Sequence, residues 1–118
     1  MADRYFVGDV DSDWNDAGNW ASSSGGSGGA GVPTSSDAVY FDSNSVGGCT
    51  LDIDGECASL SQTGGDGASI TTDGYNLTVG GSMTINGSGT TALDCTAGTG
   101  GTSAISCVDF EQWFLNHL

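Results

Sequence analysis

Basic side chains are almost absent from this sequence. Its 118 residues include 15 aspartates and glutamates, one arginine (Arg4) and no lysine, which gives a formal net charge of −14. Affinity for nucleic acids and for anionic membranes comes largely from Lys and Arg side chains that neutralise phosphate groups. The composition therefore argues against both as partners. It leaves cationic surfaces, divalent metal ions and neutral partners such as sugars, although solubility alone is the simpler explanation of the charge.

Long apolar runs and proline are scarce as well. No run of about 18 apolar residues occurs, so we expect no transmembrane span. The opening "MADRYFVGDV" lacks the basic and apolar regions of a signal peptide. We therefore expect either a leader that has been removed or another way out of the cell, such as release with virus particles on lysis. A single proline among 21 glycines argues against a collagen or a proline-rich linker.

Residue patterns for catalysis are also missing. His117 is the only histidine and lies one residue from the C-terminus, where a Ser-His-Asp triad would lack support. No P-loop, G-x-S-x-G or H-E-x-x-H motif is present. Aspartates are so frequent that no particular pair of carboxylates indicates glycoside chemistry. The sequence predicts a protein that is not an enzyme.

The abundant residues predict an all-β fold. Glycine, Ser, Thr, Asp and Asn favour turns, while Val, Ile, Thr and aromatic residues favour short strands. Alternating segments separated by glycine predict strands at residues 4–7, 38–42, 49–53, 58–62, 68–72, 75–79, 82–86, 91–95 and 103–107.

Each of the strands predicted beyond residue 48 offers only one or two apolar residues to a core. The residues expected to point inward are Leu51, Ile53, Leu60, Ile70, Leu77, Val79, Met83, Ile85, Leu93 and Ile105. Strands of about five residues with such frequent turns suit a β-sandwich or a β-solenoid. In a solenoid each coil stacks on the last, so few apolar residues per coil suffice. The sequence favours a short-stranded β-solenoid-like stack, with a β-sandwich as the alternative.

We expect one β-rich domain over residues 1–107. The segment "ASSSGGSGGAG" at 21–31 resembles a linker, but a predicted strand follows it closely. We interpret it as a flexible surface loop within the domain.

The final segment, residues 108–118, departs from the β pattern. Phe110, Trp113, Phe114 and Leu118 fall at helical spacing and predict a short C-terminal helix. A helix of this length is marginal in isolation and must dock. It either caps its own β-stack or docks into a neighbouring subunit.

The D-x-D-x-D run formed by Asp9, Asp11 and Asp13 resembles the beginning of a calcium loop. An EF-hand loop starting at Asp9 needs glycine at position six and glutamate at position twelve, but this chain has Trp14 and Trp20 there. An EF-hand is therefore excluded. A weak calcium site built from the three aspartates and backbone carbonyls remains an alternative to aspartates that solvate a turn. No other cofactor is predicted.

Four cysteines, Cys49, Cys57, Cys95 and Cys107, allow three disulfide pairings. We favour Cys49–Cys57 with Cys95–Cys107, because both bonds would clip adjacent turns. The spacings of eight and twelve residues, without C-x-x-C or a second histidine, do not indicate zinc. Reduced, buried cysteines are the alternative if the chain folds in a cytoplasm.

Several short motifs occur in order along the first half of the chain. They are "RYFVG" (4–8), Trp14, "NW" (19–20), "SSSGGSGGAGVPTSSD" (22–37) and "VYFD" (39–42). This order, with the strand-like segments that follow to about residue 87, resembles a recurrent segment of tailed-bacteriophage structural proteins.

The resemblance implies a β-rich, solenoid-like virion surface protein: a capsid decoration, head-fibre or tail-associated component without catalytic residues. It also implies that Trp14 and Trp20 are structural and cover the first end of the β-stack. Acidic spacing is not a fixed feature of the corresponding segment, which favours a turn over an ion site at "DVDSD".

We therefore expect a non-enzymatic phage structural protein on the virion surface. It would form a homo-oligomer and contact capsid or tail proteins through Phe110, Trp113, Phe114 and Leu118. One alternative is a sugar-binding adhesin or recognition module, and another is a subunit of a secreted extracellular filament. The candidates for stacking on sugar rings are Tyr5, Tyr40, Tyr75, Trp14 and Trp20.

Overall fold

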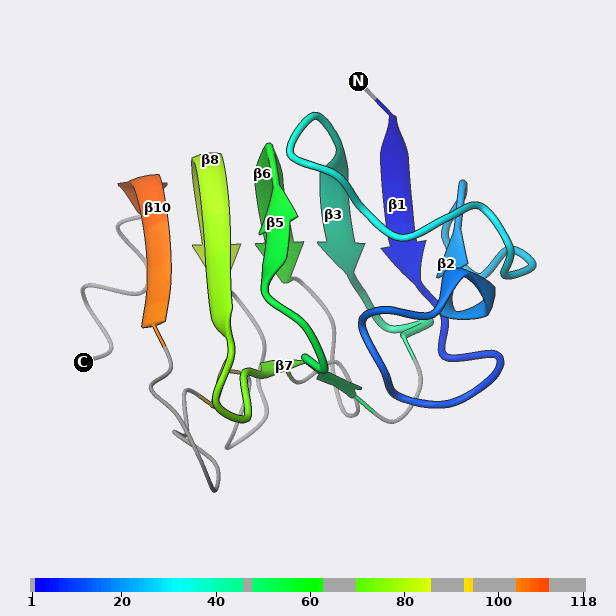
Figure 1. Cartoon of the computed structure of the whole chain (residues 1–118). Coiled ribbons are helices and arrows are strands. Elements are labelled where there is room, and N and C mark those ends of the chain that lie inside the picture. The colour runs from blue at the N-terminus through cyan, green and yellow to red at the C-terminus, as the bar shows by residue number, and fades with distance from the viewer. Residues whose placement is uncertain (1, 46–47, 63–69, 86–92, 95–103, 111–118) are drawn as a thin grey trace.

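The computed structural model describes residues 2–45, 48–62, 70–85, 93–94 and 104–110 (Figure 1). Within these ranges the regular structure is β-strand, apart from one 3-10 turn, η1 (Ala17–Asn19). The all-β prediction is therefore confirmed. The strands are β1 (Asp3–Phe6), β2 (Trp20–Ala21), β3 (Ala38–Phe41), β4 (Cys49–Thr50), β5 (Gly55–Cys57), β6 (Ser59–Gln62), β7 (Ile70–Thr71), β8 (Asn76–Ile85), β9 (Leu93–Asp94) and β10 (Ala104–Phe110).

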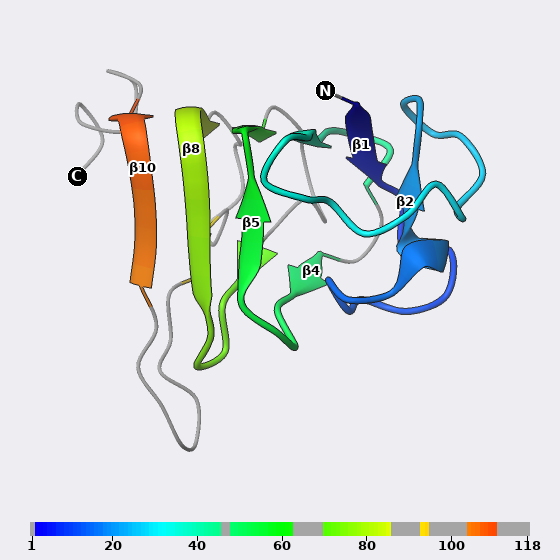
Figure 2. The ribbon, with the colours of Figure 1, turned by 45° about the horizontal axis from the view of Figure 1, so that its top comes forward.

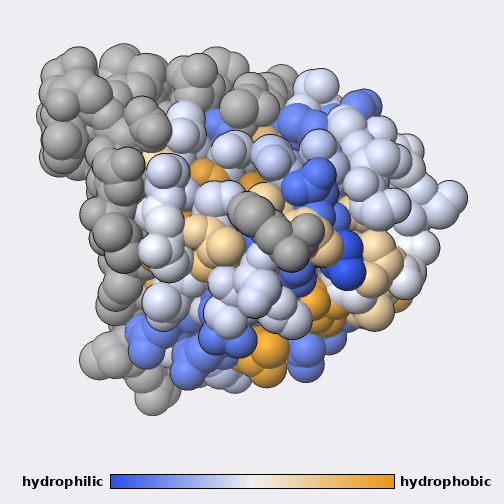
Figure 3. Space-filling model, turned by 90° about the horizontal axis from the view of Figure 1, so that it is seen from above, coloured by the Kyte–Doolittle hydropathy of each residue, from blue (hydrophilic) through white to orange (hydrophobic). Residues whose placement is uncertain are grey.

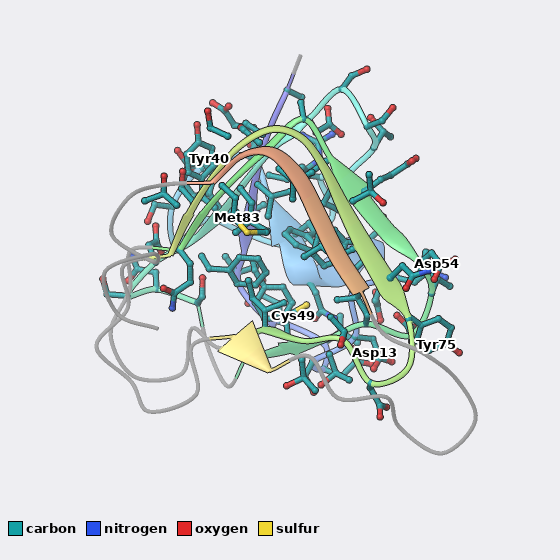
Figure 4. The ribbon with its side chains drawn as sticks, turned by 90° about the vertical axis from the view of Figure 1, so that its left-hand side faces the viewer. Asp13, Tyr40, Cys49, Asp54, Tyr75 and Met83 are labelled. Atoms are coloured by element: carbon teal, nitrogen blue, oxygen red, sulfur yellow. The ribbon has the colours of Figure 1, made fainter. Side chains whose placement is uncertain are left out.

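Two sheets face one another across the core. The larger has the order β10-β8-β6-β3-β1-β2, with β5 paired to the first half of β8, and the smaller has the order β4-β7-β9. All pairs are parallel except β1–β2, which is antiparallel. Figure 4 looks along the direction in which the strands stack, and there Met83 and Cys49 point inward from opposite sheets.

Strand register advances by similar steps in both sheets. In the larger sheet Val39 pairs with Leu60 and Leu60 with Met83, which are steps of 21 and 23 residues. In the smaller sheet Cys49 pairs with Ile70 and Ile70 with Leu93, again 21 and 23 residues apart. Each passage of the chain through both sheets therefore returns about 4.8 Å further along, the spacing of neighbouring strands.

The core is a narrow set of apolar ladders between the sheets. Of the residues predicted to point inward, six are buried, and they are Leu51, Leu60, Ile70, Leu77, Val79 and Met83. Ile53 was predicted wrongly, because its side chain is 37% exposed. The reason is that β4 already ends at Thr50, so the alternation of a strand does not continue through the turn to β5. The side chains of Ile85, Leu93 and Ile105 lie outside the described part of the structure.

The segments "YNLTV" and "SMTIN", predicted as separate strands, form one strand, β8. Gly80 and Gly81 join them at the point where the neighbouring chain passes from β5 to β6. A Cβ atom at Gly81 would lie 2.8 Å from the carbonyl oxygen of Ala58. Glycine is therefore needed here for the close approach of two backbones rather than for a turn.

Aspartates at one corner tie successive passages of the chain together. The Asp52 Oδ1 atom accepts a hydrogen bond from the backbone N–H of Asn15 at 2.8 Å. The Asp54 Oδ1 atom accepts one from the backbone N–H of Asn76 at 2.9 Å. These carboxylates satisfy backbone donors that the short strands leave unpaired.

The predicted C-terminal helix is wrong over its first three residues. Residues 108–110 complete β10, which runs parallel to β8 with Asp109 opposite Ser82 and Phe110 opposite Met83. The predicted boundary at residue 107 thus falls inside a strand. The edge of β8 offers backbone partners at every second residue, whereas a short isolated helix is marginal. Trp113, Phe114 and Leu118 lie outside the described residues.

Candidate functional site

The acidic segment at the start of the chain is organised by the side chain of Asn19, which is fully buried. The Asn19 Oδ1 atom accepts hydrogen bonds from the backbone N–H groups of Val10 (2.9 Å) and Asp11 (3.0 Å). The Asn19 Nδ2 group donates to the Asp11 Oδ1 atom (2.6 Å) and to the Asp13 carbonyl oxygen (2.9 Å). One amide group thus holds three of the five residues of the D-x-D-x-D run, Val10, Asp11 and Asp13.

The backbone around Asn19 explains why it occupies this position. The side chain of Asp16 caps η1 by accepting a hydrogen bond from the Gly18 N–H at 2.9 Å. The Asn19 N–H donates to the Asp16 carbonyl at 3.0 Å, and the Asn19 carbonyl accepts from the Val7 N–H at 2.8 Å. The turn therefore delivers Asn19 to the centre of the loop.

Two of the three aspartates proposed as calcium ligands have hydrogen-bond partners of their own. The Asp9 carboxylate accepts a hydrogen bond from the Gly28 N–H at 2.8 Å, whereas Asp11 accepts from Asn19 and from the Asp13 N–H. In the described ranges, no three His, Cys, Asp or Glu side chains are grouped so that they could hold a metal ion. A hydrogen-bond donor, Asn19 Nδ2, lies between the Asp11 carboxylate and the Asp13 carbonyl. This arrangement favours a turn centred on Asn19 over the weak calcium site.

The pKa values of Asp11, Asp13 and Asp37 are shifted in different directions. The Asp13 N–H and the Asn19 amide lower the pKa of Asp11 by stabilising its carboxylate. Partial burial, followed by the negative charges of Asp11, Asp52 and Asp16, raises the pKa of Asp13. Burial of Asp37 by itself would raise its pKa, but hydrogen bonds from Thr34 and Ala2 and the charge of Arg4 lower it overall.

These shifts predict a stability maximum on the acid side of neutrality. As the pH falls towards the ordinary pKa of an aspartate, about 4, Asp13 takes up its proton earlier in the folded state than in the unfolded chain, and the loss of its charge relieves repulsion from Asp11, Asp52 and Asp16, so stability should rise modestly. Below about pH 4, near the ordinary pKa of an aspartate, protonation of Asp11 and Asp37 removes the stability that their carboxylates provide. Thermal unfolding across this pH range measures the profile. In an Asp37→Asn variant the acid limb should be shallower, and an unchanged limb would contradict the role of Asp37.

Trp14 and Trp20 lie fully buried in an aromatic cluster with Phe6 and Phe41. The two indole rings meet edge to face with centroids 4.9 Å apart, and the Trp20 ring lies 5.3 Å from Phe6 and 5.9 Å from Phe41. The Trp20 Nε1 group donates to the Trp14 carbonyl oxygen at 2.8 Å, whereas Trp14 Nε1 has no partner among the described residues. Both tryptophans are buried in the core, and neither ring is available to a sugar.

The segment 21–31 is held by hydrogen bonds, contrary to the prediction of a flexible loop. Gly29 N–H donates to the Ala17 carbonyl at 2.9 Å, and Ala30 N–H donates to the Trp20 carbonyl at 2.9 Å. The Arg4 Nε group donates to the Gly31 carbonyl at 3.0 Å. The glycines of the segment 21–31 permit close packing. A Cβ atom at Gly28, for example, would lie 1.7 Å from the Gly18 carbonyl oxygen. We refer to residues 7–31 as the cap, because they close the β1–β2 end of the stack (Figures 1 and 2).

The predicted disulfide between Cys49 and Cys57 is not formed, since both cysteines are free and buried. They lie in different sheets, β4 and β5, and each packs in the core. Cys57 and Cys107 share a ladder but are separated by Val79 on β8. Two strand spacings, about 9–10 Å, exceed the reach of a disulfide. Cys95 lies outside the described residues.

Both core thiols should resist alkylation in the folded protein. Burial, with a smaller contribution from Glu56, raises the pKa of Cys57 to about 12, and burial raises that of Cys49 well above its usual range. Thiolate, the reactive form, is therefore scarce at pH 8. Treatment with iodoacetamide followed by mass spectrometry of Asp-N peptides should find both unmodified, and modified only when guanidinium is present. Rapid alkylation of the native protein, or a peptide cross-linked between Cys49 and Cys57, would contradict this.

The tyrosines lie on the outside of the stack, at two separate places. Tyr5 on β1 and Tyr40 on β3 pair in register, and their rings stack with centroids 4.5 Å apart and planes inclined by 15°. Tyr75 lies in the turn before β8 and is 40% exposed. Figure 4 shows Tyr40 and Tyr75 at opposite sides of the molecule. Of the five aromatic residues proposed as sugar contacts, only Tyr5 and Tyr40 come together on the surface.

Of the predicted contact residues in the C-terminal segment, the structure describes only the backbone of Phe110. Phe110 is the last residue of β10, which ends the order of the larger sheet. Trp113, Phe114, Leu118 and His117 lie outside the described residues. The structure therefore tests neither their helix nor their docking role.

Sequence reasoning did not identify Asn19 or Asp37 as organising residues. Asp37 accepts hydrogen bonds from the Thr34 N–H (2.8 Å), the Thr34 hydroxyl (3.1 Å) and the Ala2 N–H (3.3 Å). The T-x-x-D spacing is a local signal that could have indicated the first two bonds. For Asn19 no local signal exists, because its partners include residues eight and nine positions earlier in the chain.

Comparisons of the chain with protein-family models, curated protein sequences and solved structures found no match. None of the helices in the described ranges is long and apolar enough to cross a membrane.

Proposed function

We propose that the chain is a short β-solenoid-like stack that serves as a non-enzymatic structural subunit on the surface of a phage particle. Steps of 21 and then 23 residues in both sheets support the solenoid-like arrangement. The ordered motifs of the first half, from "RYFVG" to "VYFD", are the basis for the virion assignment.

The observation that carries this proposal is the difference between the two ends of the stack. At one end the cap closes the core with Trp14 and Trp20, and β2 runs antiparallel to β1. At the other end the larger sheet finishes with β10, which pairs with β8. A closed end cannot accept another strand, so assembly contacts belong to the β10 end. Phe110 ends β10, and Trp113, Phe114 and Leu118 follow it in the sequence.

The outer surface suits a subunit that faces solvent. Among the described residues the large exposed apolar side chains are Val10, Ile53 and Tyr75, and the face seen from above carries only small, separate hydrophobic areas (Figure 3). Several carboxylates, such as those of Asp9, Asp37 and Asp52, accept hydrogen bonds from backbone N–H groups and so stabilise the fold of this chain. A net charge of −14 keeps such a surface soluble and away from nucleic acid.

Deletion of residues 111–118 tests the assembly role. The chain should end at Phe110, because a deletion from residue 108 would remove the end of β10 and confuse folding with docking. We expect the truncated protein to keep its unfolding temperature but to lose oligomers in light scattering and to lose binding to particles. A Trp113→Ala/Phe114→Ala double variant of the full chain is the matched control and should behave alike. A truncated protein that still assembles and binds particles would contradict the docking role.

The secreted filament remains a second candidate. It shares the same stack and the same β10 end, but it predicts that the pure protein polymerises without any particle. Light scattering over time at increasing protein concentration separates the two: a finite oligomer favours the virion subunit, and open-ended growth favours the filament.

A further inference from the structure

The outer face of the larger sheet carries one row of side chains that changes character halfway. Tyr5, Tyr40, Ser61 and Thr84 occupy the same register position on four neighbouring parallel strands, β1, β3, β6 and β8. They stand about 4.8 Å apart, the spacing of adjacent strands. The first two are aromatic and the last two are small hydroxyl residues.

Because small residues follow Tyr40 in the row, a space is left beside its ring, which we call the step. Tyr5 covers one face of the Tyr40 ring, with the two ring centroids 4.5 Å apart, so the rings stack on one another along the row. The other face points along the row towards Ser61, whose side chain ends one bond beyond Cβ. The place that a third stacked ring would occupy is therefore not filled by the residue in register.

Polar groups surround this step. Ser61 and Thr84, the next two residues of the row after Tyr40, both carry hydroxyls. Burial, then the charge of Asp3 and the neighbouring Tyr5, raises the pKa of Tyr40, so its phenol stays protonated as a donor. An aromatic face beside a few placed hydroxyls is the usual composition of a site for a small polar ring.

We propose that this step binds a neutral saccharide, with one sugar ring stacked on the free face of Tyr40 and its hydroxyls bonded to Ser61 and Thr84. The negative ring face attracts the C–H edge of the sugar, while the row of hydroxyls continues for further units. Uronates, sulfated glycans and nucleotides are disfavoured, because Asp3 lies beside Tyr40 and the whole chain carries −14. This inference does not depend on the virion assignment.

Binding is tested with neutral oligosaccharides of glucose, galactose, mannose and N-acetylglucosamine, added separately to the isotope-labelled full chain. At least one should cause saturable NMR shifts centred on the amides of Tyr40, Ser61 and Thr84. Polygalacturonate and heparin, the anionic controls, should cause none. The inference is overturned if no neutral oligosaccharide gives saturable shifts, or if the shifts centre elsewhere.

Two variants locate the site. Tyr40→Ala removes the stacking face and should weaken binding about tenfold or more. Ser61→Tyr extends the aromatic ladder into the step and should weaken binding equally while leaving the fold intact, which guards against a Tyr40→Ala protein that is merely destabilised. Tyr75→Ala, at the exposed tyrosine on the other side, should bind as the original chain does. Unchanged affinity in Ser61→Tyr, or an equal loss in Tyr75→Ala, would refute the site.

Discussion

Replacement of Trp20 by alanine is expected to lower the free energy of unfolding by about 3–5 kcal/mol, enough to unfold much of a domain of ordinary stability. The ring is fully buried and contacts Trp14, Phe6 and Phe41, so its removal leaves a cavity at the closed end of the stack. The Trp14 carbonyl also loses its hydrogen-bond donor. Urea unfolding followed by circular dichroism measures the loss.

Two phenylalanine variants separate packing from hydrogen bonding. Trp20→Phe and Trp14→Phe both shrink a buried ring, but only Trp20 uses its N–H, which donates to the Trp14 carbonyl. Trp20→Phe should therefore cost about 1 kcal/mol more than Trp14→Phe. If Trp14→Phe proves the more damaging, the hydrogen bond does not contribute as proposed, and packing of Trp14 against Gly55 is the more important contact.

Replacement of Asn19 is expected to have the second largest effect. Asn19→Ala leaves the N–H groups of Val10 and Asp11 and the Asp13 carbonyl without their partner, and we expect a loss of about 3 kcal/mol. Asn19→Asp should be worse at neutral pH, because a carboxylate replaces the amide donor that faces the Asp11 carboxylate. Thermal unfolding of both variants measures the difference.

Asn15→Ala is the matched control for Asn19, because Asn15 is exposed and donates to Asp52 through its backbone N–H, which alanine retains. Its stability should stay within about 0.5 kcal/mol of the original. Calcium gives a second comparison: it should leave the original chain unchanged and partly restore Asn19→Asp, in which carboxylates replace the amide donor at the centre of the loop. Calcium-dependent stability of the original chain would instead make Asp9, Asp11 and Asp13 ligands.

Local patterns were sufficient to predict the all-β class and six residues of the core. A strand alternates its side chains with a period of two, so Leu60, Leu77 and Val79 could be assigned to the inside from their immediate neighbours. The same reasoning failed at Ile53, because alternation holds only while the strand continues. Motif order predicts structural roles for Trp14 and Trp20, and both rings are fully buried.

The sequence by itself therefore determined that this acidic, glycine-rich chain forms short strands around a narrow core. Only the tertiary structure decided which strands pair, that residues 108–110 extend β10, that Cys49 and Cys57 are apart, and that Asn19 holds the acidic loop. The physical reason is the distance along the chain over which each choice is made. Strand propensity acts within a few residues, whereas parallel pairs form between residues 21 or more positions apart and depend on how the whole chain closes.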